Sequence, residues 1–226
     1  MSDPNAGKRA AAQAAADLVQ DGMTIGLGSG STFVIVIEHL AARMAKGLKL
    51  TGVPTSRGTA EAAQRAGIPL LELDAVERLD LAIDGADEVN PQKSLIKGGG
   101  GAHVRERLVA AAAKEFVVVV DESKLVDVLG KAFLLPVEVL QFGWKHTERR
   151  IAATGCKPAL RMSDGKPFVT DNGNYVLDCK YDGIEDPAWL AEHLNSLVGV
   201  VDHGLFVGMA GRVLVGDSAG KVRVVP

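Results

Sequence analysis

Short apolar runs alternate with helical patterns over roughly the first 130 residues. The apolar runs predict strands, and apolar residues that recur every three or four positions predict helices. The run at 116–120 is almost pure valine, which is typical of a strand buried on both faces of a parallel sheet. The alternation predicts an α/β fold with a doubly wound, mostly parallel, Rossmann-like sheet. The predicted strands are residues 23–27, 48–53, 69–73, 81–84 and 116–120, and the predicted helices are residues 8–20, 33–46, 59–66 and a segment from 104 onward.

The order of elements changes after Gly130, where strands and helices follow one another as β-α-β-β-α-β. This order is that of the ferredoxin-like arrangement. The strands are expected at 134–140, 158–162, 175–179 and 199–203, and the helices at 145–154 and 189–197. We therefore predict a small α+β, ferredoxin-like domain at 131–204 and a larger Rossmann-like domain at 1–130 and 205–226. The short strands expected to return to the larger domain are residues 205–209, 213–215 and 222–225.

Composition narrows the class of protein. The 226 residues are 47% hydrophobic and 23% charged, as in an ordinary soluble globular protein. The net charge of −3 and the lack of a basic stripe argue against nucleic acid as a partner. No apolar run reaches the roughly 20 residues of a membrane span, and the alanine-rich start does not resemble a secretory signal. Cys156 and Cys179 are too few for a disulfide framework, so a reduced, cytoplasmic location is predicted.

A turn rich in glycine and hydroxyl groups, Gly28-Ser29-Gly30-Ser31-Thr32, joins the first predicted strand to the helix after it. Backbone N–H groups and the positive end of the helix dipole make such a turn suitable for a phosphate. The turn has neither the G-K-[ST] of a Walker loop nor a complete dinucleotide fingerprint. An ordinary strand-to-helix turn with a Ser or Thr cap is the alternative.

Three carboxylates, Asp84, Asp87 and Glu88, lie at and just after the end of the strand at 81–84. Ligands of open α/β sheets bind outside the carboxyl ends of the strands. These side chains are therefore candidates for acid–base chemistry or for binding Mg²⁺, and capping of the next element is the alternative. A metal site would need more oxygen ligands from elsewhere, and the sequence identifies none.

Lys97 precedes four consecutive glycines, Gly98–Gly101, and then a helical pattern that carries Glu106. The glycines indicate positive φ angles or the close approach of a ligand. Lysine is suited to hold an anionic oxygen, and glutamate is suited to move a proton. A solvated helix face is the alternative for Glu106, and His103 is expected at the surface.

The helix after the glycines is expected to bury its apolar residues and to turn Glu106 away from them. The expected buried stripe is Val104, Leu108, Ala111 and Ala112.

Several motifs in order along the chain carry a resemblance to a known family. They are GLGSGST, DGADE, IKGGGGA followed by RE, DESK and LPVEV, and TDNGNYVLD adds to them further along. With these motifs the sequence resembles type A ribose-5-phosphate isomerase. One departure is Ser29, where the family usually has threonine, and serine keeps the hydroxyl group.

The resemblance implies a metal-free aldose–ketose isomerase without a cofactor, which interconverts D-ribose 5-phosphate and D-ribulose 5-phosphate. It also implies a homodimer, with a tetramer as the alternative. It implies that Glu106 is the general base and that Asp84, Asp87 and Lys97 are catalytic positions around the sugar. It also implies that Lys8 is a weaker phosphate contact, supplied by a partner subunit. The other implied substrate contacts are Ser29, Gly30, Ser31, Thr32, Asp84, Gly85, Ala86, Asp87, Lys97, Gly98, Gly99, Gly100 and Lys124.

Two other classes of function fit parts of the pattern. A sugar-phosphate sensing module would bind without turnover and would need neither Glu106 nor Lys97. A Mg²⁺-dependent phosphotransferase would use Asp84, Asp87 and Glu88, but the lack of a Walker lysine argues against it. Fold alone does not separate these classes, so the isomerase prediction depends on the side chains.

Overall fold

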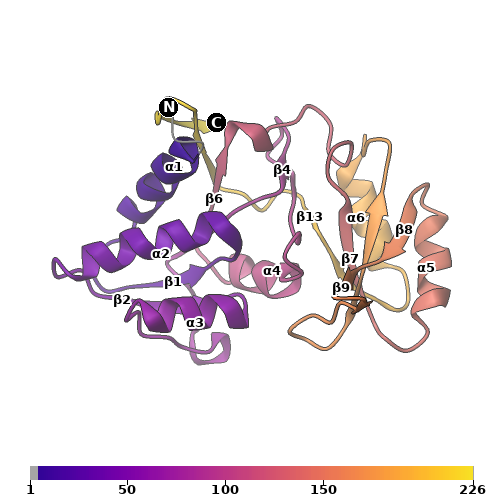
Figure 1. The fold of residues 1–226 in the computed structure, drawn as a ribbon, viewed down its shortest axis with the longest axis horizontal. Helices are drawn as coiled ribbons and strands as arrows, with labels where there is room; N and C mark the ends of the chain where they lie inside the picture. Colours follow the sequence, from indigo (N-terminus) through magenta and orange to yellow (C-terminus); the bar gives the residue numbers. More distant parts are fainter. Residues whose placement is uncertain (1–4, 226) are drawn as a thin grey trace. The chain divides into compact units, whose positions relative to one another are not determined.

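The computed structural model describes residues 5–225, and packing divides them into two compact units. The parallel unit consists of residues 5–86, 105–125 and 209–225, and the antiparallel unit consists of residues 87–104 and 126–208. Figure 1 identifies the helices and strands of both units. The grouping of 87–104 with the antiparallel unit follows packing alone, and the functional domain limits expected from the sequence stay a prediction. No helix within residues 5–225 is long and apolar enough to cross a bilayer.

The parallel unit contains, within the described residues, a six-stranded sheet in the order β15-β14-β6-β3-β1-β2. Every neighbouring pair is parallel except β14 and β15, which are antiparallel. The strand bounds are β1 Met23–Leu27, β2 Leu50–Pro54, β3 Leu81–Asp84, β6 Phe116–Asp121, β14 Arg212–Gly216 and β15 Val222–Val225. The predicted mostly parallel sheet is therefore confirmed, with β15 as the antiparallel edge.

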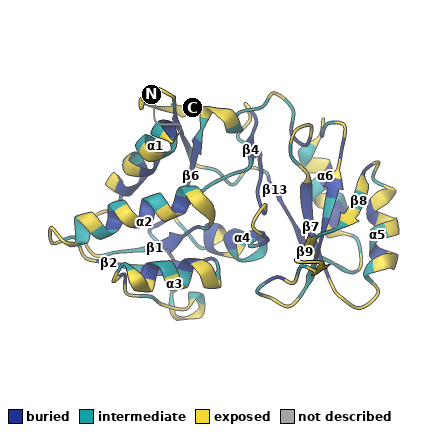
Figure 2. Cartoon of the chain, in the orientation of Figure 1, coloured by how far each residue is buried: buried dark blue, intermediate teal, exposed yellow. Residues whose placement is uncertain are grey.

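Helices cover both faces of this sheet. The three N-terminal helices are α1 Ala6–Asp17, α2 Gly30–Met44 and α3 Arg57–Arg65, and they share one hydrophobic core with the alternate strand residues Ile25 and Leu27. Gly26 points to the opposite face, because successive residues of a strand alternate between faces. There it meets Val109 of α4, His103–Ala111. Figure 2 shows the buried side of these helices in dark blue and the exposed side in yellow.

The antiparallel unit has the predicted ferredoxin-like topology. Residues 126–208 are all described, and their four-stranded sheet has the order β12-β7-β11-β8 with every pair antiparallel. The main elements are β7 Leu135–Val139, α5 Trp144–Ala152, β8 Lys157–Leu160, β11 Tyr175–Lys180, α6 Pro187–Asn195 and β12 Val200–His203. A hairpin of β9 Met162–Ser163 and β10 Lys166–Pro167 follows β8.

Two predicted strands differ from the structure. Residues 69–73 form a single bridge, from Leu70 to Gly52, and then the short 3-10 helix η1 Leu73–Ala75. This segment lies at the outer edge of β2, and Pro69 has no N–H group to donate to a ladder. The predicted strand at 205–209 is shorter and stays in the antiparallel unit, where β13 joins a small sheet. That sheet has the order β13-β5-β4, with β4 Glu88–Val89, β5 Leu95–Ile96 and β13 Leu205–Phe206.

Candidate functional site

The first group of predicted site residues lies in the parallel unit, at the carboxyl ends of β1 and β3. The chain passes from β1 to β2 on one side of β1 and then returns to β3 on the other side. A reversal of this kind leaves a crevice at the carboxyl ends of the two central strands, where open α/β sheets bind ligands. Ser29 follows β1 and Asp84 ends β3, so the topology places both residues at this point.

Asp84 is buried and holds the glycine turn through backbone N–H groups. Ser29 N–H donates to Asp84 Oδ1 at 2.9 Å, and Gly85 N–H donates to the same oxygen at 2.7 Å. A Cβ atom at Gly28 would overlap the Asp84 carboxyl group, so glycine is needed for this close approach. The two strand ends are therefore tied together by one carboxylate.

Glu106 lies on the buried face of α4 and contacts the same turn. The Ser29 hydroxyl group donates a short hydrogen bond to Glu106 Oε1, and the Glu106 side chain is 6% exposed. The expected packing of this helix was wrong, because Leu108 is 56% exposed while Glu106 and Val109 are buried. The helix buries a polar carboxylate against the glycine turn, a contact that an apolar pattern cannot indicate.

The glycine turn leads directly into α2, which begins at Gly30 with Ser29 as its N-cap residue. Gly30 has a φ angle of 82°, which favours glycine. The Ser29 side chain makes no capping bond, because its hydroxyl group is directed to Glu106. Ser31 is exposed and Thr32 is half-buried in the first helical turn. The N–H groups of that turn are suited to an anion.

Two threonines that the sequence analysis did not single out support this turn. Thr59 Oγ1 donates to the Gly28 carbonyl oxygen at 2.8 Å, and Thr55 Oγ1 donates to the Leu27 carbonyl oxygen at 3.0 Å. Both threonines are buried. The available signal was their place after the neighbouring strand, β2: Thr55 follows it directly and Thr59 lies in the first turn of α3. Parallel pairing brings the end of β2 to the same edge of the sheet as the end of β1.

The second group of predicted site residues lies in the antiparallel unit, around the four glycines. Gly99 N–H donates to Asp87 Oδ2 at 2.9 Å. Lys97 is buried, its N–H donates to the Gly204 carbonyl oxygen at 2.9 Å, and its Nζ lies 5.5 Å from the centroid of the Phe206 ring. A cation over an aromatic face is electrostatically favourable. The structure thus fixes Lys97 at both its backbone and its side chain.

The glycine loop, residues 98–101, has the backbone conformations that its sequence predicts. Gly98 has a φ angle of 96° and Gly101 has a φ angle of 76°. His103 lies against Gly98 and is fully buried, so its expected surface position was wrong. Its ring fills the space that a side chain at position 98 would need, and this packing gave no signal in the sequence.

Each of the three carboxylates near β3 holds a different loop. Asp84 binds Ser29 and Gly85, and Asp87 binds Gly99. Glu88 accepts from the N–H groups of Gly130 and Phe133, at 2.7 and 2.8 Å. Within residues 5–225, no three His, Cys, Asp or Glu side chains gather as metal ligands. The hydrogen bonds give Glu88 a structural role that the sequence left open.

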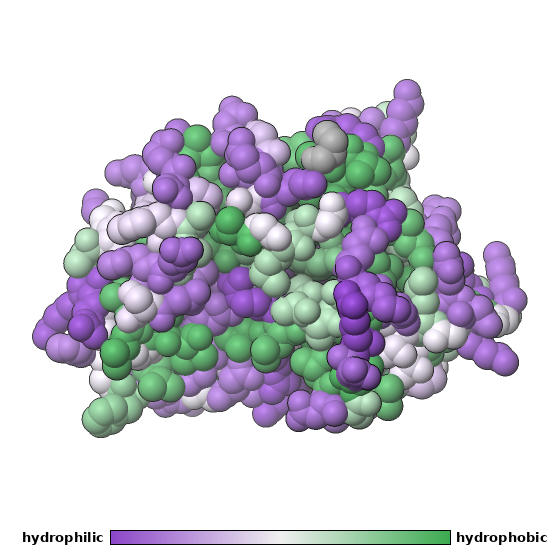
Figure 3. Space-filling view, turned by 180° about the vertical axis from the view of Figure 1, so that it is seen from behind, coloured by the Kyte–Doolittle hydropathy of each residue, from purple (hydrophilic) through white to green (hydrophobic). Residues whose placement is uncertain are grey.

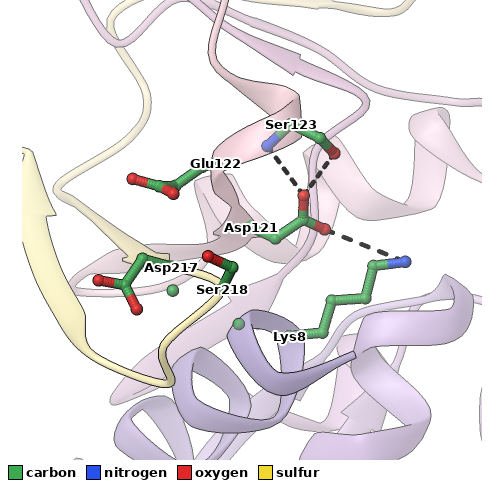
Figure 4. Close-up of a pocket in the computed structure, with 8 residues that line it drawn as sticks. Lys8, Asp121, Glu122, Ser123, Asp217 and Ser218 are labelled. Atoms are coloured by element: carbon green, nitrogen blue, oxygen red, sulfur yellow. Dashed lines mark hydrogen bonds and ion pairs between the residues drawn. The ribbon is translucent and has the colours of Figure 1, made fainter. Parts of the chain in front are cut away.

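The structure groups Lys8 with acidic side chains. Lys8 Nζ lies 4.0 Å from Asp121 Oδ2, in a pocket of about 320 Å³ (Figure 4). The pocket is lined by Gly7, Lys8, Asp121, Glu122, Ser123, Gly216, Asp217 and Ser218. Lys124 is the last residue of the short 3-10 helix η2, Glu122–Lys124. It directly follows Ser123, which lines the pocket. The predicted phosphate contacts of Lys8 and Lys124 stay predictions.

Known proteins resemble the chain over nearly its whole length. A sequence model of the family ribose 5-phosphate isomerase A (phosphoriboisomerase A) matches residues 51–220. Ribose-5-phosphate isomerase A 1 of Oceanobacillus iheyensis is 49% identical over 96% of this chain and 97% of its own. Ribose-5-phosphate isomerase A of Thermosynechococcus vestitus is 53% identical over 93% of this chain and 91% of its own.

Solved structures agree with the sequence comparisons. Ribose 5-phosphate isomerase A from Methanocaldococcus jannaschii superposes with a TM-score of 0.91 at 41% identity, over 96% of each chain. A D-ribose-5-phosphate isomerase in complex with phospho-erythronic acid superposes with a TM-score of 0.93 at 38% identity, again over 96% of each chain.

Proposed function

Because the chain belongs to the ribose-5-phosphate isomerase A family, we propose that Glu106 is the base of its reaction and that the sugar passes through a cis-enediol(ate). The chain is a ribose-5-phosphate isomerase of the pentose phosphate pathway, which interconverts D-ribose 5-phosphate and D-ribulose 5-phosphate. The observation that carries the proposal is a buried carboxylate, Glu106, hydrogen-bonded to the hydroxyl group of the glycine turn.

Isomerisation moves one proton from carbon 2 of the open-chain aldose to carbon 1. A single carboxylate on one face of the enediol performs both transfers, so Glu106 suffices as acid and base. A positioned base of this kind contributes roughly 10²–10⁴-fold to the rate. Asp84 is proposed to move the hydroxyl proton or to assist ring opening, because its carboxylate is fixed at the same strand ends.

The enediolate oxygens need hydrogen-bond donors. We assign this role to Lys97 and to N–H groups of Gly98–Gly100, with Asp87 orienting Lys97. One such donor contributes about 3–4 kcal/mol to transition-state stabilisation. The phosphate group on carbon 5 of the sugar is assigned to the turn Ser29–Thr32, whose N–H groups and hydroxyls suit an anion. Lys124 and, more weakly, Lys8 are proposed to add positive charge.

Substitution of Glu106 by glutamine tests the assignment of the base. Glu106→Gln keeps the shape of the side chain and removes its basicity, so kcat is expected to fall by at least about 10²-fold. Incorporation of solvent tritium into the substrate is expected to stop, while ribose 5-phosphate still binds in calorimetry. Glu38→Gln, at an exposed position on α2, is the matched control.

Persisting tritium exchange in Glu106→Gln would contradict the assignment and would make His103 the next candidate for the base.

Formation of ribulose 5-phosphate from ribose 5-phosphate in excess EDTA tests the predicted metal independence. Turnover is expected to continue, and activity lost with EDTA would return the carboxylates Asp84, Asp87 and Glu88 to the metal hypothesis.

A homodimer and a cytoplasmic location are further proposals. Side chains of Leu140, Phe142 and Val198 are exposed where β7 ends and β12 begins, and Phe142 is 96% exposed. Leu140 N–H donates to the Gly199 carbonyl oxygen at 3.0 Å, so the two segments that carry these side chains lie next to each other. The face in Figure 3 carries green apolar patches between purple polar ones, and patches of this kind often mark contacts between proteins.

The cytoplasmic location is supported by the two cysteines. Buried free thiols at Cys156 and Cys179 fit a reducing compartment.

A further inference from the structure

We propose that Arg161, held by Asp178, is a positioning residue that sets the orientation of the Gly98–Gly100 peptides and so presents the Gly100 N–H group to the substrate. The proposal rests on the role assigned above to the glycine loop. Arg161 lies between β8 and β9, more than fifty positions after the loop, and no sequence motif connects the two segments.

The Arg161 guanidinium group has partners on both of its sides. Its Nε donates to Asp178 Oδ2 at 2.9 Å and its Nη2 donates to Asp178 Oδ1 at 2.5 Å. Its Nη1 donates to the carbonyl oxygens of Gly98 and Gly99, at 3.1 and 3.0 Å. The two side chains are 14% and 20% exposed. One rigid, planar cation is therefore shared between a carboxylate and two consecutive loop carbonyls.

These bonds determine where the loop N–H groups point. In a trans peptide the C=O group and the following N–H group point in opposite directions. The Gly98 carbonyl group faces Arg161, and Gly99 N–H accordingly faces Asp87 on the other side of the loop. The Gly99 carbonyl group also faces Arg161. Gly100 N–H is therefore turned to the side away from the guanidinium group, the side on which Asp87 lies.

A second contact from the same segment fixes the far end of the loop. Phe168 pairs with Arg161 through a backbone hydrogen bond of 2.9 Å, and its ring centroid lies 5.6 Å from Arg161 Cζ. A Cβ atom at Gly101 would overlap the Phe168 ring, so the ring rests directly on the glycine backbone. Gly99 and Gly100 stay exposed between these contacts and Asp87. The loop is thus fixed on one side and open on the other.

Only an arginine satisfies this geometry. The planar guanidinium fork binds a carboxylate with two nitrogens and still offers the third to the carbonyl groups, whereas the ammonium group of lysine is a point charge. An oxyanion donor works when it is already aligned before charge develops. Arg161 acts through the loop and does not touch the substrate.

Arg161→Ala is expected to lower kcat by about 10²-fold, because a small displacement of a reacting group has an effect of this size. KM is expected to change little, since the phosphate is assigned to the separate Ser29–Thr32 turn. Added guanidinium ion, below denaturing concentration, is expected to restore part of kcat by occupying the vacated site. Arg161→Lys is expected to lose about 10-fold in kcat, because it keeps the charge but not the fork.

Arg212→Ala is the matched control. Arg212 forms an equivalent two-nitrogen pair with Glu115, at 2.5 and 2.6 Å, and donates to no glycine-loop carbonyl group in the described contacts. We expect Arg212→Ala to leave kcat unchanged, even if it lowers the midpoint of thermal unfolding by as much as Arg161→Ala. If Arg161→Ala does not fold, Arg161→Lys and its kcat decide the question.

A folded Arg161→Ala or Arg161→Lys with unchanged kcat would overturn the proposal. A loss confined to KM, or a loss that guanidinium does not restore and that tracks unfolding, would also overturn it. Glu106→Gln and Lys97→Ala distinguish a failure of the positioning role from a failure of the assigned site. If they are inactive while the Arg161 variants are active, only the positioning role fails; if they are active too, the assigned site itself fails.

Discussion

At the scale of single residues, burial separates side chains that look alike in the sequence. Glu106 and His103 both seemed compatible with a solvated helix face, yet both are buried. The reason is that His103 packs against Gly98, and Glu106 accepts a hydrogen bond from Ser29 in the glycine turn. Neither contact can be read from the helical pattern. The candidate residue types were predictable from the motifs, whereas their partners, such as Ser29 for Glu106, depend on contacts far along the chain.

Tyr181 gives a residue-scale prediction about pH. Burial raises the pKa of its phenol well above the usual value, and its hydroxyl lies 2.6 Å from Thr154 Oγ1. A group whose pKa is raised by folding contributes stability that is complete below its unfolded pKa and is lost as pH rises beyond it. The free energy of unfolding should therefore decline above about pH 10, where an unfolded tyrosine ionises.

Tyr181→Phe is expected to flatten this decline and to lose about 1 kcal/mol near neutral pH with the hydrogen bond to Thr154. Urea unfolding at several pH values between neutral and strongly alkaline measures both effects. Tyr175→Phe, which leaves Tyr181 in place, is the control. An unchanged alkaline slope in Tyr181→Phe would show that other groups cause the loss.

At the scale of helices and strands, periodicity predicted the long elements and missed the short ones. β1, β3 and β15 have the predicted bounds, because their apolar runs are bounded by clear turn residues. β4 and β5 have two residues each, too few to show any period. The segment at 69–73 had the composition of a strand, but only one of its residues pairs with β2. Pairing depends on what lies beside a segment, and a linear pattern does not contain that information.

The packing of α4 on the sheet gives a prediction at this scale. A Cβ atom at Gly26 would overlap Val109 Cγ1 and lie 3.0 Å from Ala82 Cβ. Gly26→Ala is therefore expected to destabilise the fold by about 1–3 kcal/mol, the usual cost of overpacking. It should also lower kcat, because Val109 and Glu106 lie one turn apart on α4.

The double variant Gly26→Ala with Val109→Ala is the control for this contact. Removal of the valine methyl groups makes room for the added Cβ atom, so the double variant should be more stable than the sum of the single effects predicts. Denaturant midpoints of the four proteins measure the coupling. Simple additivity would show that α4 moves away from the sheet without strain.

At the scale of the whole molecule, the order of the motifs predicted more than any motif alone. The glycine turn, the carboxylates and the glycine loop were each compatible with several functions. Their sequence along one α/β pattern, followed by a ferredoxin-like order, indicated a single family, and the comparisons confirmed it. The division into units was harder to predict from the sequence, because the chain crosses between the units near residues 86, 104, 125 and 208.

The proposed homodimer is a prediction at this scale. Light scattering after size-exclusion chromatography should give a mass of twice 23.7 kDa. If the apolar patch of Leu140, Phe142 and Val198 is the interface, Phe142→Ser should halve that mass without unfolding the chain. Val34→Ser, at an exposed apolar position on α2, is the control. A mass of 23.7 kDa for the unsubstituted chain would contradict the proposal.

The position of β14 beside β6 also has a consequence for synthesis of the protein on the ribosome. β6 ends at residue 121 and its neighbour begins at residue 212, so 212 − 121 = 91 positions separate them. At 5–20 residues per second, the nascent β6 waits about 5–18 s with one edge unpaired. All of residues 126–208 emerge during that interval, so the antiparallel unit is complete first. The parallel unit, which contains Ser29, Asp84 and Glu106, therefore matures last, although those residues are translated early.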